Sequence, residues 1–377
     1  MAGPLAGVRV VELAGIGPGP FAGMLLADLG AEIIRVDRAA DLGGDELRAL
    51  AHAVIDRGRR SIAVDLKQPA GREVVLALAE RADVIIEGFR PGVAERLGVG
   101  PEDVAARNPR LVYGRMTGWG QSGPYAHLAG HDLNYIAAAG ALALGRGADG
   151  VPVPPENVLG DFGGGSLYLV TGILAALLHA RETGRGQVVD AAIVDGAASL
   201  MAMHHAMINT GVIKRNPMDG GAPYYRVYRT ADDRFLAVAA MEPQFWAELL
   251  DGLGLADREL PDRDDPANWP ELGELFAEII RGRPLADWLA AFEGRDACVT
   301  AVCTPGEAPH DPHLAARRAY LPAGADGAGW QPAPAPRLSV TEPELPGPPP
   351  RIGQHTDEVL AELGIDADAL RAAGVVG

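Results

Sequence analysis

Several kinds of residue are scarce in this chain, and each scarcity excludes a class of protein. Only two of the 377 residues are cysteines, Cys298 and Cys303, too few for a disulfide framework or a cysteine-based zinc site. We expect both to be reduced packing residues beside a short strand. The longest apolar run, around residues 167–178, is shorter than the roughly 20 residues that a membrane-spanning helix needs. No basic segment precedes an apolar one near the N-terminus, so we expect a cytoplasmic protein without membrane insertion.

Positive charge is the second scarcity. The 33 lysines and arginines stand against 50 aspartates and glutamates, which gives a net charge of −17 and argues against a nucleic-acid partner. Residues 1–120 contain 15 basic and 16 acidic residues, whereas the remainder contains 18 and 34. The first 120 residues would therefore repel a phosphorylated small molecule least.

The chain contains enough apolar material for two domains. Hydrophobic residues make up 48% of the sequence, which excludes intrinsic disorder. In the first 200 residues, short β-branched runs alternate with helical segments, and this alternation predicts an α/β domain with a doubly wound parallel sheet. The predicted strands are 8–13, 32–37, 61–66, 83–87, 111–116 and 187–193, and the predicted helices are 21–29, 71–81, 161–181 and 196–209.

The pattern changes after Gly220 and predicts a smaller domain of mixed α and β structure. Two strand-like runs, 224–230 and 235–240, are joined by a short polar turn that is typical of a hairpin. Helices are predicted near 243–254, 270–281 and 285–292, followed by a strand at 298–303. Residues 331–350 are rich in proline and predict an extended strap, and short helices at 357–363 and 367–372 follow it.

A glycine-rich turn near the N-terminus raises the alternative of an NAD-dependent Rossmann enzyme. Gly-Pro-Gly-Pro-Phe-Ala (17–22) follows a predicted strand, and Asp37 ends the next one, as in a dinucleotide-binding fingerprint. Pro18 and Pro20 count against this interpretation, because proline removes the backbone N–H groups that a pyrophosphate needs.

Basic residues gather near the ends of the predicted strands. Arg38, Lys67 and Arg90 follow strand ends, where the binding crevice of an open α/β sheet lies. Such a set suits a multiply phosphorylated ligand, although solvated arginines paired with nearby acids are the ordinary alternative. The neighbouring basic residues with the same two interpretations are Arg57, Arg59, Arg60 and Arg96.

The segment Gly-Asp-Phe-Gly-Gly-Gly (160–165) begins the predicted apolar helix. Asp161 could cap the exposed N–H groups of that helix. The three glycines after it are poor helix formers, and their use is to let a ligand approach the backbone closely. The helix N-terminus would also favour a developing enolate, with N–H donors from residues 160–165. The nine histidines show no ligand spacing, so we expect no metal site.

Motifs spread over essentially the whole chain carry a resemblance. The sequence resembles the family III CoA-transferase superfamily in Gly-Ile-Gly-Pro-Gly-Pro-Phe-Ala (15–22), Asp-Leu-Gly-Ala (28–31), Val-Asp-Leu-Lys (64–67), Gly-Phe-Arg-Pro-Gly-Val (88–93), Glu-Arg-Leu-Gly (95–98), Thr-Gly-Trp-Gly-Gln-Ser-Gly-Pro (117–124), Gly-Arg-Gly-Gln-Val-Val-Asp (184–190) and Gly-Gln-His-Thr-Asp-Glu-Val-Leu (353–360). Gly-His-Asp-Leu-Asn-Tyr (130–135), Gly-Asp-Phe-Gly-Gly-Gly (160–165) and Gly-Gly-Ala-Pro-Tyr-Tyr (220–225) are similar to its α-methylacyl-CoA racemase branch.

The resemblance implies an architecture that composition does not reveal. A large Rossmann-like CoA-binding domain would comprise residues 1–200 and be completed by 325–377. A small α+β domain would comprise 221–310, with linkers at 201–220 and 311–324. Two subunits would form an interlocked homodimer, with each active site between the large domain of one subunit and the small domain of the other.

The resemblance also implies roles for individual residues. It implies that His131, Asp161 and Glu242 are catalytic in epimerising the α-carbon of 2-methylacyl-CoA thioesters, with Glu242 orienting His131. It implies no cofactor, because CoA is part of the substrate. The residues that would bind the CoA moiety or line the reacting end are Arg38, Val64, Asp65, Leu66, Lys67, Gly88, Phe89, Arg90, Arg96, Gly130, Asp132, Leu133, Asn134 and Tyr135.

Two other functions remain open within the superfamily. In a CoA-transferase, an aspartate at the position of Asp161 would attack the thioester and carry the acyl group as an anhydride. His131 favours the racemase, since the resemblance associates that histidine with the racemase branch. The intact set of His131, Asp161 and Glu242 disfavours a CoA-binding protein without catalysis. Arg226 stands where the racemase pattern has an acidic residue, and this departure leaves the acyl substrate open.

Overall fold

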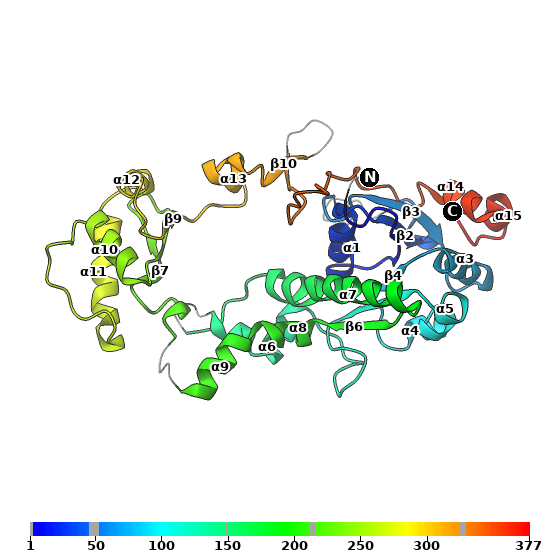
Figure 1. Cartoon of the computed structure of the whole chain (residues 1–377), viewed down its shortest axis with the longest axis horizontal. Coiled ribbons are helices and arrows are strands. Elements are labelled where there is room, and N and C mark those ends of the chain that lie inside the picture. Colours follow the sequence, from blue (N-terminus) through cyan, green and yellow to red (C-terminus); the bar gives the residue numbers. More distant parts are fainter. Residues whose placement is uncertain (1–2, 45–52, 146, 148–149, 212–215, 324–328) are drawn as a thin grey trace. The chain divides into compact units, whose positions relative to one another are not determined.

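The described residues form two compact units. A computed structural model describes the chain except for residues 1–2, 45–52, 146, 148–149, 212–215 and 324–328. The first unit comprises 1–143, 152–203 and 321–377, and the second comprises 144–151 and 204–320 (Figure 1). The domain boundaries given above stay a prediction. Residues 212–215 of one predicted linker, residue 324 of the other and residues 325–328 of the predicted return segment lie outside the described residues.

A six-stranded parallel sheet organises the first unit. Its strand order is β3-β2-β1-β4-β5-β6, and every neighbouring pair is parallel. This order confirms the doubly wound parallel sheet, because the chain moves outward in both directions from β1. The strands are β1 (Arg9–Leu13), β2 (Glu32–Arg38), β3 (Arg59–Val64), β4 (Val84–Glu87), β5 (Val112–Thr117) and β6 (Val188–Ala192).

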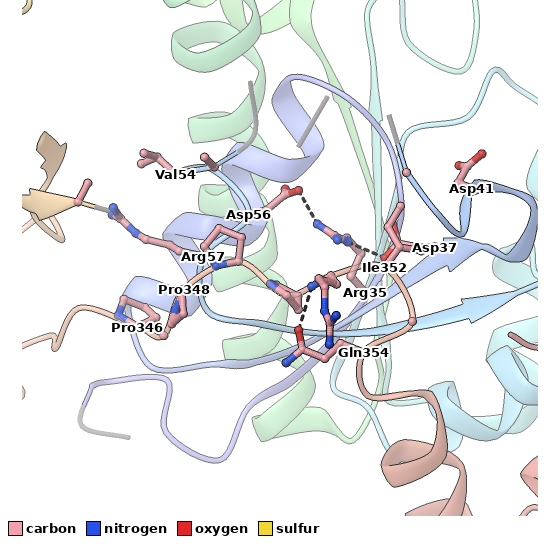
Figure 2. Close-up of a pocket in the computed structure, with 18 of the residues that line it drawn as sticks. Arg35, Asp37, Asp41, Val54, Asp56, Arg57, Pro346, Pro348, Ile352 and Gln354 are labelled. Atoms are coloured by element: carbon pink, nitrogen blue, oxygen red, sulfur yellow. Dashed lines mark hydrogen bonds and ion pairs between the residues drawn. The ribbon is translucent and has the colours of Figure 1, made fainter. Parts of the chain in front are cut away.

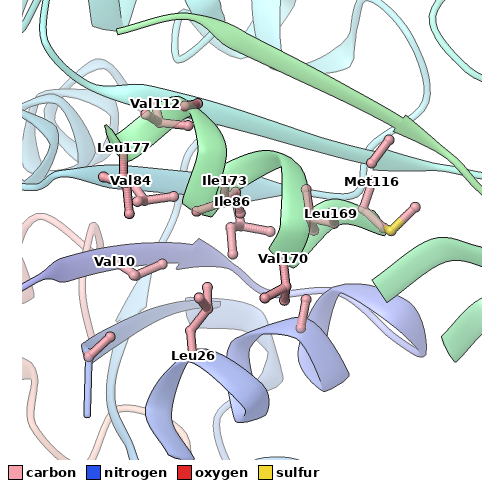
Figure 3. Close-up of a cluster of buried hydrophobic side chains, with 14 of the residues drawn as sticks. Val10, Leu26, Val84, Ile86, Val112, Met116, Leu169, Val170, Ile173 and Leu177 are labelled. Atoms are coloured by element: carbon pink, nitrogen blue, oxygen red, sulfur yellow. The ribbon is translucent and has the colours of Figure 1, made fainter. Parts of the chain in front are cut away.

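One face of the sheet packs against helices α1 (Pro18–Asp28) and α7 (Leu167–Thr183). Figure 3 shows Ile173 and Leu177 of α7 over Val84, Ile86 and Val112, with Leu26 of α1 beside them. Val158–Thr183 is long and apolar enough to cross a membrane by composition alone. Its Leu169, Ile173 and Leu177 are buried in this core. A helix inside a folded domain can be equally apolar, so the composition alone does not indicate a membrane span.

The opposite face packs against α3 (Pro69–Glu80), α5 (Pro101–Arg107), α14 (Thr356–Leu363) and α15 (Ala367–Ala372). The C-terminal segment also extends the edge of the sheet at β3 (Figure 1). His355 N–H donates to the Ser61 carbonyl over 2.8 Å, and Asp65 N–H donates to the Val375 carbonyl over 2.8 Å. The strand that precedes the predicted CoA-binding turn is therefore supported by residues almost 300 positions later.

The predicted helix at 161–181 is wrong in its first turn. Residues Val158–Ser166 form a π-helix, and α7 begins only at Leu167. Glycines at 160 and 163–165 weaken the ordinary helical turn, and π-helical turns are frequent at functional sites. The predicted helix at 196–209 is in fact two helices, α8 (Ile193–Leu200) and α9 (Ala202–Thr210). Four short helices were not predicted: α4 (Val93–Leu97), α5, α6 (Asp132–Ala138) and, in the second unit, α13 (Pro312–Ala316).

The second unit is a three-stranded antiparallel sheet packed against helices. The predicted hairpin is confirmed as β7 (Tyr225–Arg229) and β8 (Phe235–Ala239), and β9 (Val299–Ala301) pairs with β8. Leu249, Phe276 and Trp288 form the core beneath this sheet. Its helices are α10 (Pro243–Gly252), α11 (Trp269–Arg281), α12 (Leu285–Ala291) and α13 (Pro312–Ala316). The next two strands along the chain, β10 (Tyr320–Ala323) and β11 (Gly329–Pro332), form a separate two-stranded sheet, and from Leu321 on they belong to the first unit.

The structure corrects two expectations, one about the cysteines and one about the arginines near the strand ends. Both cysteines are free thiols, but Cys303 is exposed, so the packing role expected for it is wrong. Arg57 and Arg59 are neither solvated nor free to hold a ligand, because each is buried against an acid of the same unit, Asp28 and Glu12 respectively. Ion pairing is thus the correct interpretation for both, although the pairs are internal.

The buried arginines join separate parts of the first unit. Arg59 donates through Nε to Glu12 over 2.9 Å and through Nη2 to the Pro20 carbonyl of α1 over 2.5 Å. A side chain at Gly23 would collide with both partners of this pair. Arg57 donates to both carboxylate oxygens of Asp28 and, through Nη1, to Gln331 and the Pro332 carbonyl. Arg57 thereby fastens the start of the proline-rich strap to α1.

Removing Arg57 should destabilise the fold strongly. Arg57→Met keeps the apolar stem but leaves the Asp28 carboxylate buried without its partner, so we expect the free energy of unfolding to fall by about 3–5 kcal/mol. Urea denaturation measures this change. Arg107→Met is the matched control, because Arg107 pairs with Glu73 and Glu80 at the exposed surface and should shift the midpoint little. Equal effects of the two substitutions would contradict a role for burial.

Candidate functional site

Two cavities of different character are lined by described residues of the first unit. The larger, about 1750 Å³, lies between β2, residues 53–57 and the strap at 345–354. Figure 2 shows that its charged groups bond to one another: Arg35 contacts Asp37 over 2.9 Å and Asp56 over 2.5 Å. Among the described residues that line it there is no histidine, and none of the predicted catalytic residues. Since its buried arginines, Arg35 and Arg57, are already paired and the predicted catalytic residues lie elsewhere, the larger cavity is not the candidate active site.

The smaller cavity, about 610 Å³, lies at the carboxyl ends of β1, β4 and β5. Its walls come from the 13–20 turn, the 88–91 loop and residues 117–119 after β5. In open α/β sheets, ligands bind at this edge of the strands. His131 and Asp161 both line this cavity, and so it brings together the two residues on which the predicted chemistry depends.

Hydrogen bonds to the backbone fix both residues. His131 precedes the first turn of α6, and its N–H donates to Asn134 Oδ1 over 3.1 Å. Asp161 lies within the π-helix, and its N–H donates to Asp132 Oδ1 over 2.6 Å. Gly160 is required beside this bond, because a Cβ there would come within 2.2 Å of Asp132 Oδ1. Asp132 therefore connects the segment of His131 to that of Asp161.

The environment of Asp161 favours its protonated form. Burial raises the pKa of this carboxyl, and the nearby Asp132 carboxylate raises it further. A hydrogen bond with Asn157 and the positive charge that His131 can carry act in the opposite direction, but are smaller. A carboxyl whose pKa is raised toward neutrality can serve as an acid and as a base.

Helix α1 points its N-terminus at the same carboxylate. Gly17 has φ of 70°, and a Cβ there would lie 3.4 Å from Asp161 Oδ2. The positive end of α1 therefore faces Asp161. Asp37, the acid of the dinucleotide fingerprint, is buried and already binds Arg35 and the Ser61 hydroxyl. The turn at 17–22 thus faces an acid of its own chain, and the fingerprint lacks a free ribose-binding carboxylate.

The other predicted site residues fall into two groups. Six of them line the cavity with His131 and Asp161: Arg38, Gly88, Phe89, Arg90, Gly130 and Tyr135. Eight do not line it: Val64, Asp65, Leu66, Lys67, Arg96, Asp132, Leu133 and Asn134. Asp132 and Asn134 instead make the backbone contacts described above. Val64 is the last residue of β3, and residues 65–67 form the turn after it, at another carboxyl end of the same sheet.

Glu242 belongs to the second unit, where it is exposed at the N-cap of α10. The backbone before it is held by Arg263, which donates to the carbonyls of Ala240 and Met241. The Arg263 guanidinium lies 4.7 Å from the Tyr224 ring centroid and 5.0 Å from that of Trp246. Arg263 lies in an irregular loop, where hydrophobic periodicity provides no signal.

Several cavity residues were missed by sequence reasoning. Trp119 packs edge-on against Tyr135 at 4.8 Å between ring centroids, and its motif was noted without a role. Ile16 and Leu128 line the cavity and are more than half exposed, which makes an apolar rim.

Within the described part of the chain, no three His, Cys, Asp or Glu side chains gather as metal ligands would.

Comparisons with known proteins extend over almost the whole chain. The model of CoA-transferase family III matches residues 5–356. The α-methylacyl-CoA racemases of Mus musculus and Homo sapiens are 45% and 42% identical over 373 residues, which cover 97% of this chain and 95% of each relative. The succinate–glutarate CoA-transferase of Agrobacterium fabrum is 30% identical and covers 96% of both chains.

A solved structure agrees with these matches. The crystal structure of a CAIB/BAIF family protein from Brucella suis has a TM-score of 0.84 and 27% identity, and covers 96% of this chain and 100% of its own. The fold described above therefore recurs in a crystallised protein of similar length.

Asp161→Asn should stabilise the protein at neutral pH. Because the folded-state pKa of Asp161 is raised, its contribution to stability is present below the ordinary carboxyl pKa and is lost as pH rises through the raised value. Asparagine does not ionise, so the variant should be more stable than the wild type at pH 8. This advantage should shrink below about pH 4, where both folded and unfolded carboxyls are protonated. Denaturant midpoints across pH measure it, and a constant difference would contradict the raised pKa.

Proposed function

The chain belongs to CoA-transferase family III, and within that family we propose that it is a racemase acting on acyl-CoA thioesters. It epimerises the α-carbon of 2-methylacyl-CoA and so interconverts the R and S forms. Identity above 40% to two α-methylacyl-CoA racemases over nearly the full length supports this activity. The observation that carries the proposal is the shared cavity of His131 and Asp161 at the carboxyl ends of the sheet.

Inversion at this carbon requires two groups that exchange protons. The proton next to a thioester is weakly acidic, and a single base cannot reach both faces of the planar enolate. We assign one face to the His131 imidazole and the other to the Asp161 carboxyl. In one direction neutral His131 removes the proton and protonated Asp161 returns one from the opposite side. The raised pKa of Asp161 increases the fraction of enzyme with that acid protonated.

The enolate needs stabilisation beyond proton transfer. General-base catalysis supplies about 10²–10⁴-fold, roughly 3–5 kcal/mol, less than the pKa difference between the base and the carbon acid demands. The backbone donors predicted at 160–165 are partly engaged, because Asp161 N–H binds Asp132 and Phe162 N–H binds the Asn157 carbonyl. We therefore assign the larger role to the positive end of α1 and to the Tyr135 hydroxyl. Burial, followed by Asp161, raises the pKa of Tyr135, which keeps this donor protonated.

The CoA moiety would occupy the basic side of the cavity. Arg38 and Arg90 line it, and Lys67 follows the neighbouring strand end. Glu87 supports the Arg90 loop by accepting the Phe89 N–H over 2.6 Å while it pairs with Arg115. The apolar rim of Ile16 and Leu128 suits an acyl chain. We propose that the reaction needs no cofactor, that CoA enters only with the substrate, and that the protein works in the cytoplasm without membrane insertion.

We further propose that the active form is an interlocked homodimer. Helices α7, α8 and α9 expose large apolar side chains that a second subunit would cover, among them Leu178, Leu200 and Ile208. In this arrangement a Rossmann-like large domain from one subunit would meet the small α+β domain of the other. Glu242 would then reach His131 from the partner chain and orient it.

Hydrogen exchange at the α-carbon tests the two assigned bases. One epimer of a 2-methylacyl-CoA, incubated with enzyme in D₂O without an acceptor acid, should epimerise and gain deuterium at C2. His131→Ala and Asp161→Asn should each abolish epimerisation, because a return proton is then missing from one face. Any exchange that remains should occur without inversion and from one epimer only. NMR of the substrate measures both processes.

The same assay separates the racemase from a CoA-transferase. A transferase using an Asp161 anhydride would leave the thioester unchanged until a carboxylic acid is added. Inertness of the wild type without acceptor, followed by formation of a new acyl-CoA on adding succinate, would overturn the proposed function. Unchanged epimerisation by His131→Ala would overturn the assignment of that residue alone.

Complementation tests the shared active sites. Co-expression of His131→Ala and Glu242→Gln chains with different tags yields mixed dimers, in which one site contains both changes and the other contains neither. Isolated mixed dimers should therefore recover about half of the wild-type kcat, whereas both parent variants stay impaired. Mixed dimers no more active than the parents would contradict sites built from two chains.

A further inference from the structure

We propose that Ser166 is a positioning residue for Asp161, and that its hydroxyl fastens the π-helix of Asp161 to the first turn of α1. This inference rests on the proposed function, in which Asp161 must stand opposite His131. Ser166 is fully buried. Its Oγ lies 2.7 Å from the Pro18 carbonyl oxygen and 3.0 Å from the Asp161 carbonyl oxygen. A single donor is thus shared by acceptors on two elements that form the cavity wall.

The placement of this hydroxyl differs from what a serine at a helix start usually does. Ser166 occupies the N-cap position of α7, where its side chain would ordinarily accept a bond from a helix N–H. It makes no such bond. The Leu167 N–H already donates to the Phe162 carbonyl through the π-helix. Because the π-helical hydrogen bond already satisfies this N–H group, the Ser166 hydroxyl is available to donate to the Pro18 carbonyl of α1.

Other contacts join the same two elements and pack them closely together. The rings of Phe21 and Phe162 stack with their centroids 4.4 Å apart. A Cβ at Gly165 would lie 3.4 Å from the Pro18 side chain. Pro18 fixes its own φ, so its carbonyl is a well-defined acceptor for Ser166. The stacked rings supply apolar contact, and the serine supplies the directional bond that sets how far Asp161 stands from α1.

Loss of this bond should affect both the position and the ionisation of Asp161. A displacement of about 1 Å in a reacting group can cost roughly 100-fold in rate. A loosened π-helix would also admit water to the carboxyl and weaken the burial that raises its pKa. The titratable groups that face Asp161 are His131, Asp132 and Tyr135, and the first turn of α1 contributes none. None of these groups is altered by changing Ser166.

The chain offers a matched control for this serine. Ser61 is also fully buried in the first unit, donates to Asp37 over 2.6 Å and accepts the Gly353 N–H over 2.9 Å. It lies on β3 and has no role in the proposed chemistry. Ser61→Ala therefore removes a comparable buried hydroxyl without touching the element that carries Asp161.

Kinetics on the full-length enzyme test the proposal. Ser166→Ala should lower kcat for 2-methylacyl-CoA epimerisation by about 10- to 100-fold while KM changes less than about twofold. The limb of the kcat–pH profile that reports Asp161 should move to lower pH. Ser166→Cys, which keeps a weak donor of similar size, should recover part of kcat, and Ser61→Ala should keep kcat near the wild type. A wild-type kcat in Ser166→Ala, or an equal loss in Ser61→Ala, would overturn the proposal.

A second readout keeps this test independent of the reaction. The stability difference between Asp161→Asn and its parent should be smaller, and should level off at lower pH, in a Ser166→Ala background than in the wild type. If the wild type fails to exchange the α-proton, the proposed function fails, but this pH shift still decides whether Ser166 sets the environment of Asp161. An unshifted pH dependence would contradict the positioning role, whatever the reaction is.

Discussion

The seating of α1 on the parallel sheet determines the geometry of the candidate site. Arg59 connects this helix to the sheet, because its buried guanidinium binds Glu12 of β1 and the Pro20 carbonyl of α1 at the same time. Apolar packing alone could let α1 slide along the sheet, whereas two directional bonds fix its first turn. Gly17 at that turn then stands against the Asp161 carboxylate. The charge pair thus stabilises the fold and sets one wall of the cavity.

Competing influences set the pKa of Asp161, the residue proposed as the catalytic acid. Burial and Asp132 favour the protonated form of Asp161, while Asn157 and His131 favour the carboxylate. A fully buried, isolated acid would stay protonated, and a solvated one would be a weak base. Asp132 contributes in two ways, since its charge raises the pKa of Asp161 and its oxygen accepts the Asp161 N–H. The arrangement costs stability in the free protein, and in the proposed reaction it would prepare the carboxyl for both directions of proton transfer.

Much of the fold could be predicted from the sequence because β-branched strands and amphipathic helices have distinct periods. The six strands of the first unit, the hairpin β7–β8 and helices such as α3 follow these patterns. The short helices α4, α5, α6 and α13 were missed, since five to seven residues do not complete two apolar turns. The π-helix at Val158–Ser166 was missed because its apolar content resembles that of an α-helix. Asn134 was expected to bind CoA, but its side chain accepts the His131 N–H. This bond depends on local geometry, which the sequence pattern does not show.

The order of segments along the chain has a consequence for biosynthesis. The edge strand β3 emerges early from the ribosome, but its hydrogen-bonding partners near His355 and Val375 emerge about 300 residues later. The second unit, by contrast, is built almost entirely from the continuous stretch 204–320. It can acquire its core while the first unit still waits for α14 and α15. The edge of the sheet at β3 therefore stays without these partners until α14 and α15 have been synthesised.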